Sequence, residues 1–190
     1  MEDLTLWNDF RNGKEQALSY IYYHHAEFLF LYGQKFTDDK ELISDVIQDL
    51  FYDLIRTRKR LGSTDNIRFY LARSFRRKLS LEIKKSKTKF GELTEKEMNF
   101  SINEEMTLDE KSEVLNQGLK ELNSKQREIL YYKFNCEFSY EQICEIMSIS
   151  YDSARQMVSR SINSLKKILA NHKMLFLALI FRKLYNTAKK

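Results

Sequence analysis

The sequence contains no proline and only five glycines among 190 residues. Sandwiches and barrels need many turn residues, so this composition argues against an all-β fold and favours long helices. Two cysteines are too few for a disulfide framework and fit a reducing cytoplasm. The N-terminal Met-Glu-Asp-Leu-Thr has no signal-peptide core, and no apolar run approaches the roughly 20 residues of a membrane span. We therefore expect a cytoplasmic, mainly helical protein without stable membrane insertion.

Charged residues make up 31% of the chain, and their sign alternates in blocks. The net charge is −7 over residues 1–55, +11 over 56–89, −6 over 90–113 and +8 over 151–190. Two separated basic blocks indicate two contacts with one polyanion. The alternative is a pair of solvated, lysine-rich faces, since lysine is common on helix surfaces.

Apolar periodicity predicts three helices in the N-terminal part of the chain. They cover about residues 13–32, a segment that Asp38 or Asp39 caps, and about residues 67–87. The predicted core stripes of the second and third helices are Ile43, Ile47, Leu50 and Leu54, and Leu71, Phe75, Leu79 and Ile83. These helices form a first predicted domain over residues 1–89.

The C-terminal part is predicted to be a second helical domain over residues 113–190, after an acidic linker over 90–112. The negative charge of the linker either keeps it off nucleic acid or serves solubility. Ser124 is expected to cap a helix whose apolar residues include Phe134, and Ser139–Gln142 has the capping-box pattern. The predicted fold class is therefore all-α, with two small helical domains joined by the linker.

The clearest local signal is a helix-turn-helix: a short helix after Ser139, three connecting residues, and a long helix from Tyr151. In this motif the second helix enters the DNA major groove with its N-terminal half. One face of the long helix is polar at steps of three and four. Its members are Ser153, Gln156, Arg160 and Asn163, flanked by Arg155 and Ser159. An ordinary αα-hairpin with a polar outer face is the alternative, because the usual turn glycine is missing.

Basic and aromatic side chains are interleaved in the predicted third helix. They are Arg73, Arg76, Arg77 and Lys78, with Phe69, Tyr70 and Phe75. This mixture suits unstacked bases better than intact duplex, because an aromatic ring can stack on a base. We assign Phe75 to the core stripe, and leave Phe69 and Tyr70 open to either role.

Residue groupings typical of catalysis or metal binding are not evident. Cys136 and Cys144 have no close cysteine or histidine partners in the sequence. Three aspartates, Asp45, Asp49 and Asp53, lie at steps of four on one helix face. This spacing favours an acidic ridge for a basic protein partner over a pair of catalytic carboxylates. We therefore expect no enzymatic activity, no metal and no cofactor.

Several segments, taken in order, resemble the bacterial sigma-70 family of RNA polymerase sigma factors, in its extracytoplasmic-function (ECF) group. Asp45–Phe51 with Leu54 is similar to the helix of that family that binds core polymerase. Asn66 with Tyr70–Arg77 is similar to the segment that melts and reads the −10 promoter element. The segments that resemble the C-terminal DNA-binding domain are Leu122–Leu130, Ser139–Ile143 and Ile149–Arg155.

The resemblance, which covers about residues 5–87 and 114–169, implies a transcription initiation factor that binds core RNA polymerase and directs it to promoters. The residues implied for core polymerase are Asp45, Gln48, Asp49 and Phe51. Those implied for −10 DNA are Asn66, Tyr70, Arg73, Arg76 and Arg77. Those implied for the −35 duplex are Ser153, Arg155, Gln156, Ser159 and Arg160.

The chain departs from the family pattern at several positions. The family often has Leu-Pro at Leu122-Asn123, usually Asn at Arg77, and Thr-Val at Ser153-Ala154. The segment Leu61–Asn66 does not map onto the family's specificity loop, so the promoter sequence is not predicted.

Two questions stay open at the level of sequence. The apolar run Met174–Phe181 either extends the core of the last helix or forms a docking surface for an anti-sigma factor. The alternative function is a helix-turn-helix regulator that binds duplex DNA without polymerase. A nucleic-acid enzyme, such as a metal-dependent nuclease, is a third class.

Overall fold

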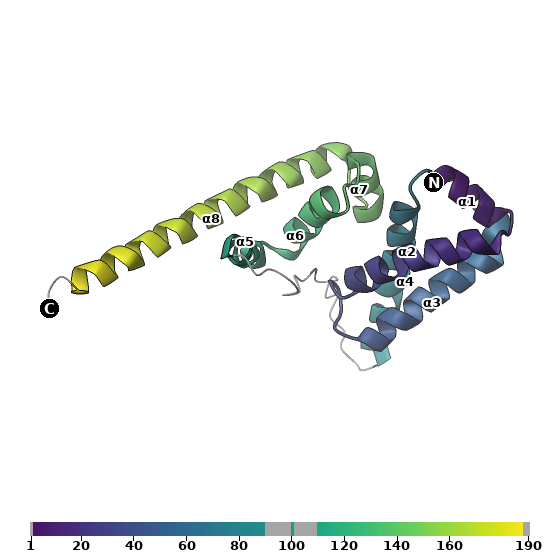
Figure 1. Cartoon of the computed structure of the whole chain (residues 1–190), viewed down its shortest axis with the longest axis horizontal. Helices are drawn as coiled ribbons and strands as arrows, with labels where there is room; N and C mark the ends of the chain where they lie inside the picture. Colours follow the sequence, from purple (N-terminus) through teal and green to yellow (C-terminus); the bar gives the residue numbers. More distant parts are fainter. Residues whose placement is uncertain (1, 90–99, 101–109, 188–190) are drawn as a thin grey trace. The chain divides into compact units, whose positions relative to one another are not determined.

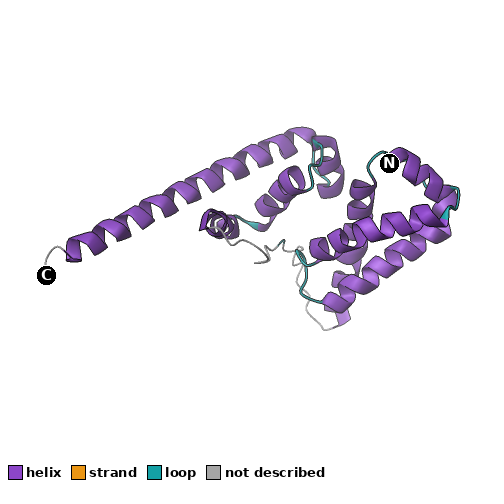
Figure 2. Ribbon diagram, in the orientation of Figure 1, coloured by secondary structure: helices purple, strands orange, loops and turns teal. Residues whose placement is uncertain are grey.

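The structure is a computed structural model that describes residues 2–89, 100 and 110–187, with side chains over 2–86, 100 and 115–171. All regular structure in these residues is helical (Figure 2). The chain divides into two compact units, which we call unit 1 (Met1–Asn99) and unit 2 (Phe100–Lys190) (Figure 1). The predicted all-α class with two helical domains is therefore confirmed.

Unit 1 is a bundle in which α2, α3 and α4 pack against one another. Its described elements are α1 (Asp3–Arg11), α2 (Glu15–Gly33), α3 (Lys40–Thr57), the 3-10 helix η1 (Arg58–Arg60) and α4 (Ile67–Lys89). The predicted core stripes are buried, except that Ile83 is only half-buried. Gly33 lies where α2 comes closest to its neighbours, because a Cβ atom there would lie 2.8 Å from Ile43 and 3.0 Å from Phe75.

Helix α1 was not predicted, because it is short and only Leu6, Trp7 and Phe10 point inward. Trp7 is fully buried, and its indole N–H donates to the carbonyl of Gly62 at 2.8 Å. A carboxylate oxygen of Asp3 accepts from the backbone N–H of Ile67, also at 2.8 Å. Helix α1 therefore holds the segment between η1 and α4, which joins the two predicted binding helices of this unit.

In unit 2 the helices α5, α6 and α7 each pack against α8. The described elements are α5 (Glu110–Glu121), α6 (Ser124–Leu130), the π-helical segment η2 (Tyr131–Asn135), α7 (Tyr140–Met147) and α8 (Tyr151–Thr187). A Cβ atom at Gly118 would lie 2.8 Å from Leu169, so this glycine permits a close approach of α5 to α8. Beyond that crossing, α8 extends past the other helices of its unit (Figure 1).

Two sequence predictions in unit 2 were wrong. The cap of α6 is Asn123, which forms a capping box with Gln126, while the hydroxyl of Ser124 accepts from the backbone N–H of Phe100 at 2.7 Å. Phe134, assigned to an apolar stripe, is 59% exposed. The reason is that the inward face of α6 is centred on Ile129, since Glu128, Ile129 and Leu130 are all buried. At 100° per residue, Phe134 lies about 140° around the axis from Ile129, whereas Tyr132 lies about 60° away and is buried.

Phe100 belongs to the segment predicted as a linker, yet its ring is buried in unit 2 beside Tyr131. Its carbonyl accepts from Arg127 Nε at 2.8 Å. The limits of the predicted linker and domains stay predictions, because most of the linker lies outside the described residues. The backbone of the apolar run Met174–Phe181 is part of α8, but its side chains also lie outside the described ones, so its role stays open. In the described part of the chain, no helix is both long and apolar enough to cross a membrane.

Candidate nucleic-acid interface

The connection between α7 and α8 has the geometry of a helix-turn-helix without a glycine. Ser139 forms the predicted capping box with Gln142 at the start of α7. At its end, Ser148 adopts the left-handed conformation with φ 56° and ψ 48°. The N–H of Ile149 donates to the carbonyl of Cys144 at 3.2 Å, which closes the helix end. Ser148 therefore performs the conformational role that glycine usually has in such a turn.

Ser150 caps α8 and engages the first polar residue of its outer face. Its Oγ accepts from the backbone N–H of Ser153 at 3.2 Å and donates to Ser153 Oγ at 2.8 Å. The hydroxyl of Ser153 then keeps its own proton for donation. One turn further, Arg160 Nη2 donates to Gln156 Oε1 at 3.2 Å, which orders these two long side chains relative to each other.

All the residues predicted for duplex binding on α8 are exposed. They are Ser153, Arg155, Gln156, Ser159 and Arg160. On the opposite side of the helix, Ala154, Val158 and Ser161 are buried against the rest of unit 2. The face therefore combines hydroxyl, amide and guanidinium groups on a rigid support, and these groups suit base edges and phosphates.

On α4, three of the four predicted basic residues lie on one side of the helix, and the fourth, Lys78, points toward α3. Arg73 and Arg77 are exposed, and Arg76 is half-buried with its guanidinium 6.0 Å from the Phe36 ring centroid. Arg73, Arg76 and Arg77 lie on one side of the helix at 100° per residue. Phe75 is fully buried, which confirms its assignment to the core.

The two other residues predicted for −10 DNA have local structural roles. The side chain of Asn66 accepts from the backbone N–H of Phe69 at 2.8 Å and so caps α4. Tyr70 is half-buried, with its ring centroid 4.8 Å from that of Trp7. Burial raises the pKa of Tyr70, although a hydrogen bond with Ser74 works in the opposite direction. Both side chains therefore support the N-terminal part of α4.

On α3, three of the four residues predicted for protein docking share an exposed face. Asp45, Gln48 and Asp49 are exposed, but Phe51 is only 5% exposed and packs edge-on against Tyr22 at 4.9 Å. The assignment of Phe51 to the surface that binds core polymerase is therefore corrected, because its ring is part of the core of unit 1.

Sequence reasoning missed Tyr52, the next residue, which is 66% exposed. Tyr52 lies four residues after Gln48 and three after Asp49, so it shares their face of α3, and Ile55 extends that face. The signal was in the helical spacing, because the buried stripe of Ile47, Leu50 and Leu54 places Phe51 rather than Tyr52 toward the core. We call Asp45, Gln48, Asp49 and Tyr52 the α3 face.

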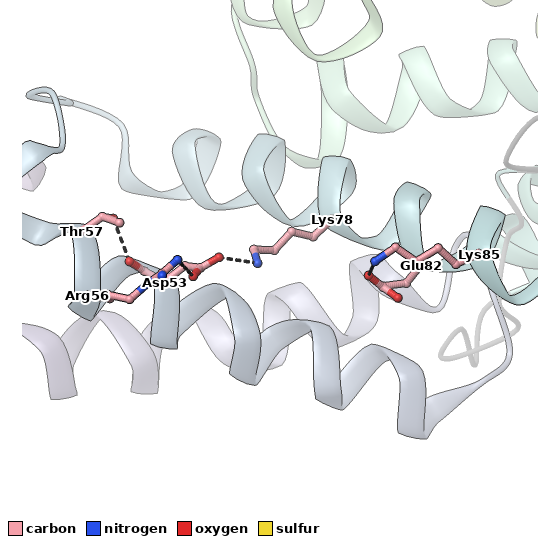
Figure 3. Close-up of polar contacts among 6 residues, drawn as sticks. All are labelled: Asp53, Arg56, Thr57, Lys78, Glu82 and Lys85. Atoms are coloured by element: carbon pink, nitrogen blue, oxygen red, sulfur yellow. Dashed lines mark hydrogen bonds and ion pairs between the residues drawn. The ribbon is translucent and has the colours of Figure 1, made fainter.

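Asp53, the third aspartate of the predicted ridge, forms ion pairs within unit 1. Its carboxylate pairs with Lys78 of α4 at 2.6 Å and with Arg56 at 2.9 Å, as Figure 3 shows. The hydrogen bond from Lys78 is the main cause that lowers the pKa of Asp53. Lys78 is thus turned away from the arginines of α4 and toward α3, and the pair ties these two helices together.

The described residues contain no group of three or more His, Cys, Asp or Glu side chains that could hold a metal ion. Cys136 is buried and Cys144 half-buried, and burial is the main cause that raises the pKa of the Cys144 thiol.

Comparison with known proteins gives a family match in the C-terminal part of the chain. Residues 112–165, from α5 into α8, match the family model described as sigma-70, region 4. Comparison with curated proteins gives no match. The region 4 match confirms the resemblance to the sigma-70 family on the segment that contains the helix-turn-helix.

Among solved structures, the chain is similar to CnrH in complex with the cytosolic domain of CnrY, at 14% identity and a TM-score of 0.57 over 89% of this chain and 97% of that one. It is also similar to the sigma factor RpoE in complex with the anti-sigma factor NepR from Bartonella quintana. There the identity is 18% and the TM-score 0.56, over 82% of this chain and 96% of that one. At these identities the likeness shows a shared fold.

Proposed function

We propose that this chain, which carries a sigma-70 region 4 domain, is a transcription initiation factor of the ECF type. It binds core RNA polymerase, directs it to promoters, contacts the −35 duplex through α8 and opens the −10 element with α4. The observation that carries this proposal is the exposed polar face of α8. This face lies inside the region 4 match and directly follows the helix-turn-helix connection in the sequence.

The contact with core polymerase is assigned to the α3 face. Three of its members are acidic or amide side chains that point to solvent, and the fourth is an exposed tyrosine. Tyrosine is enriched among residues that carry much of the binding energy at protein interfaces. The face therefore fits a partner surface that is basic and carries an apolar pocket.

The contact with opened −10 DNA is assigned to the arginine side of α4. Arg73, Arg76 and Arg77 form a short positive row that can follow a single-strand backbone. The α3 face and this row belong to the same compact unit, and the Asp53–Lys78 pair links their helices. Polymerase docking and strand capture would thus be carried by one rigid bundle.

A third partner is an anti-sigma factor. The RpoE structure that this fold resembles was solved with the anti-sigma factor NepR, and the CnrH structure with the cytosolic domain of CnrY. On this basis we propose that the chain is held inactive by a protein of this kind, without assigning the surface involved.

The test combines purified chain with core RNA polymerase that lacks any other sigma factor. We expect the two to co-elute in gel filtration and to produce discrete transcripts from fragments of the source genome. A helix-turn-helix regulator without sigma activity, the alternative function, would instead bind duplex DNA alone and leave the core enzyme unable to select start sites. Absence of both co-elution and transcripts would refute the proposal.

A further inference from the structure

A lysine and a tyrosine each contact a second tyrosine near the start of α8. Lys133 lies in η2, Tyr140 is the first residue of α7, and Tyr151 is the first residue of α8. Lys133 Nζ lies 4.6 Å from the centroid of the Tyr140 ring. The rings of Tyr140 and Tyr151 meet edge to face, with their centroids 5.6 Å apart. We call these three residues the Lys-Tyr-Tyr cluster.

Local backbone geometry determines where the cluster lies. The π-helical segment η2 and the left-handed Glu137, with φ 58°, turn the chain sharply before α7. Lys133 Nζ also donates to the carbonyl of Phe138 at 3.4 Å, which holds the ammonium over the first turn of α7. Tyr151 stays 45% exposed, so its ring is fixed on one side by Tyr140 and open to solvent on the other.

The position of Tyr151 around α8 argues for a backbone contact with DNA and against a base contact. Two residues of helix rotate by 200°, so Tyr151 lies about 160° around the axis from Ser153. It therefore cannot enter the groove together with Ser153, Gln156 and Arg160. Arg155, one turn further along α8, lies close to Tyr151 in angle and is also exposed. Lysine, arginine and tyrosine side chains are typical phosphate ligands, and such contacts set the register of the recognition helix.

We propose that the Lys-Tyr-Tyr cluster holds a backbone phosphate at the edge of the −35 duplex and thereby positions α8 in the groove. This inference rests on the proposed function. Lys133 supplies the charge and the hydroxyl of Tyr151 a hydrogen bond, while Tyr140 holds both of them in place. The phosphate oxygens accept from both donors, so the contact is independent of sequence.

Two acidic side chains lie near the cluster and oppose an anion there. Asp152 and Glu141 are both exposed, and the charge of Lys133 is one cause that lowers the pKa of Glu141, after hydrogen bonds from its own backbone and from Ser139. Glu141 thus partly neutralises the lysine. The proposal therefore predicts that removal of this carboxylate strengthens DNA binding.

The experiment measures binding of the complete holoenzyme to a promoter duplex that contains the −35 region, and to versions with single base changes there, over a series of salt concentrations. We expect Lys133→Gln to weaken binding about tenfold and to reduce the slope of log K against log salt by about one. Tyr151→Phe should weaken all duplexes alike and leave the slope unchanged. Glu141→Gln should strengthen binding.

The matched control is Lys166→Gln, which removes the same charge from an exposed position on α8. Lys166 lies 15 residues, or about 22 Å, beyond Tyr151 along the helix. This variant should leave both the affinity and the salt slope unchanged. A wild-type salt slope for Lys133→Gln would overturn the proposal. So would a loss in Tyr151→Phe that depends on one base pair, because that result assigns Tyr151 to base recognition. If wild-type holoenzyme binds no promoter duplex at all, the proposed function itself fails. If wild-type holoenzyme binds and the cluster variants bind equally well, only the proposal for the Lys-Tyr-Tyr cluster fails.

Discussion

Ser148 shows how one residue substitutes for a glycine in this fold. Left-handed backbone costs an L-residue roughly 1–2 kcal/mol, because Cβ approaches the neighbouring carbonyl oxygen. The turn tolerates that strain because buried side chains on both sides, Ile146 and Ala154 among them, determine the path of the chain. The strain is local, and it can be relieved without a change in the exposed polar face of α8.

We expect Ser148→Gly to stabilise unit 2 by about 1 kcal/mol, since glycine adopts this conformation without the steric penalty. Thermal and denaturant unfolding of the full chain measure the effect. Ser148→Ala is the matched comparison, because it removes the hydroxyl but keeps Cβ, and it should bring no gain. A glycine variant that is less stable than the alanine variant would show that backbone strain is not the controlling factor at this position.

At the scale of elements, α3 shows that adjacent residues of a helix can carry an exposed side chain and a core side chain. Phe51 and Tyr52 are neighbours in sequence, yet one is buried beside Tyr22 and the other is exposed. A rotation of 100° per residue separates them. Mutations at these two positions therefore test different properties of the protein.

We expect the double substitution Asp49→Arg with Tyr52→Ala to abolish co-elution with core polymerase. Loss of an aromatic anchor costs about 2 kcal/mol or more at an interface, and the reversed charge adds repulsion from a basic partner. Tyr23→Ala, at a tyrosine of α2 that is 81% exposed, is the control and should bind as wild type. Phe51→Ala should instead destabilise unit 1 by about 3–5 kcal/mol, as core truncations of phenylalanine do. Unchanged binding by the double variant, measured by gel filtration and quantitative pull-down, would remove the α3 face from the interface.

A second prediction at the scale of elements concerns the arginines of α8. We expect Arg155→Ala and Arg160→Ala each to weaken binding of the −35 duplex by holoenzyme, by roughly 1–3 kcal/mol where the arginine contacts a base. The outer row that contains Arg160 is the one proposed to enter the groove, so Arg160→Ala should relax specificity at one position. Arg155 lies nearer to Tyr151, so its loss should weaken all sequences alike and flatten the salt slope by about one. If duplexes with single base changes are bound in the same order by both variants and by wild type, the row does not read bases.

At the scale of the whole molecule, acidic and basic residues are concentrated on different helices and in different units. The acidic residues of α3 and the basic residues of α4 lie in one bundle, while the basic C-terminal block lies in unit 2. Lys78 and Asp53 neutralise each other where the two helices of unit 1 meet (Figure 3). Arg73, Arg76 and Arg77 lie on another side of α4, which is the surface proposed for opened DNA.

Promoter binding and promoter opening should therefore be separable. Holoenzyme that carries Arg73→Ala, Arg76→Ala and Arg77→Ala should still bind promoter duplex through α8 but fail to open it, because a backbone-tracking row is lost. Permanganate reactivity of unpaired thymines measures opening directly. Tyr70 is left intact in this variant, since it packs on Trp7 and its loss would disturb the bundle. Normal thymine reactivity at wild-type thermal stability would place strand separation elsewhere.

Much of the architecture was predictable because it depends on local chemistry. The stripes of Ile43, Leu50, Leu71 and Phe75 have helical spacing, and the capping box at Ser139 needs only residues within one turn. The polar row of α8 was likewise visible, because its members repeat at steps of three and four. The region 4 match, over residues 112–165, then agreed with the resemblance that the C-terminal segments carried.

The sequence by itself determined the helical class, the basic and acidic blocks and the outward row of α8, since each follows from composition or from the 3.6-residue period. Only the tertiary structure decided which side chains are free to bind. It directed Lys78 onto Asp53 and left Phe134 exposed in a π-helical segment. It also brought Lys133, Tyr140 and Tyr151 together from three elements. The physical reason is that burial and pairing depend on contacts between distant segments, and helical spacing specifies only the face on which a residue lies.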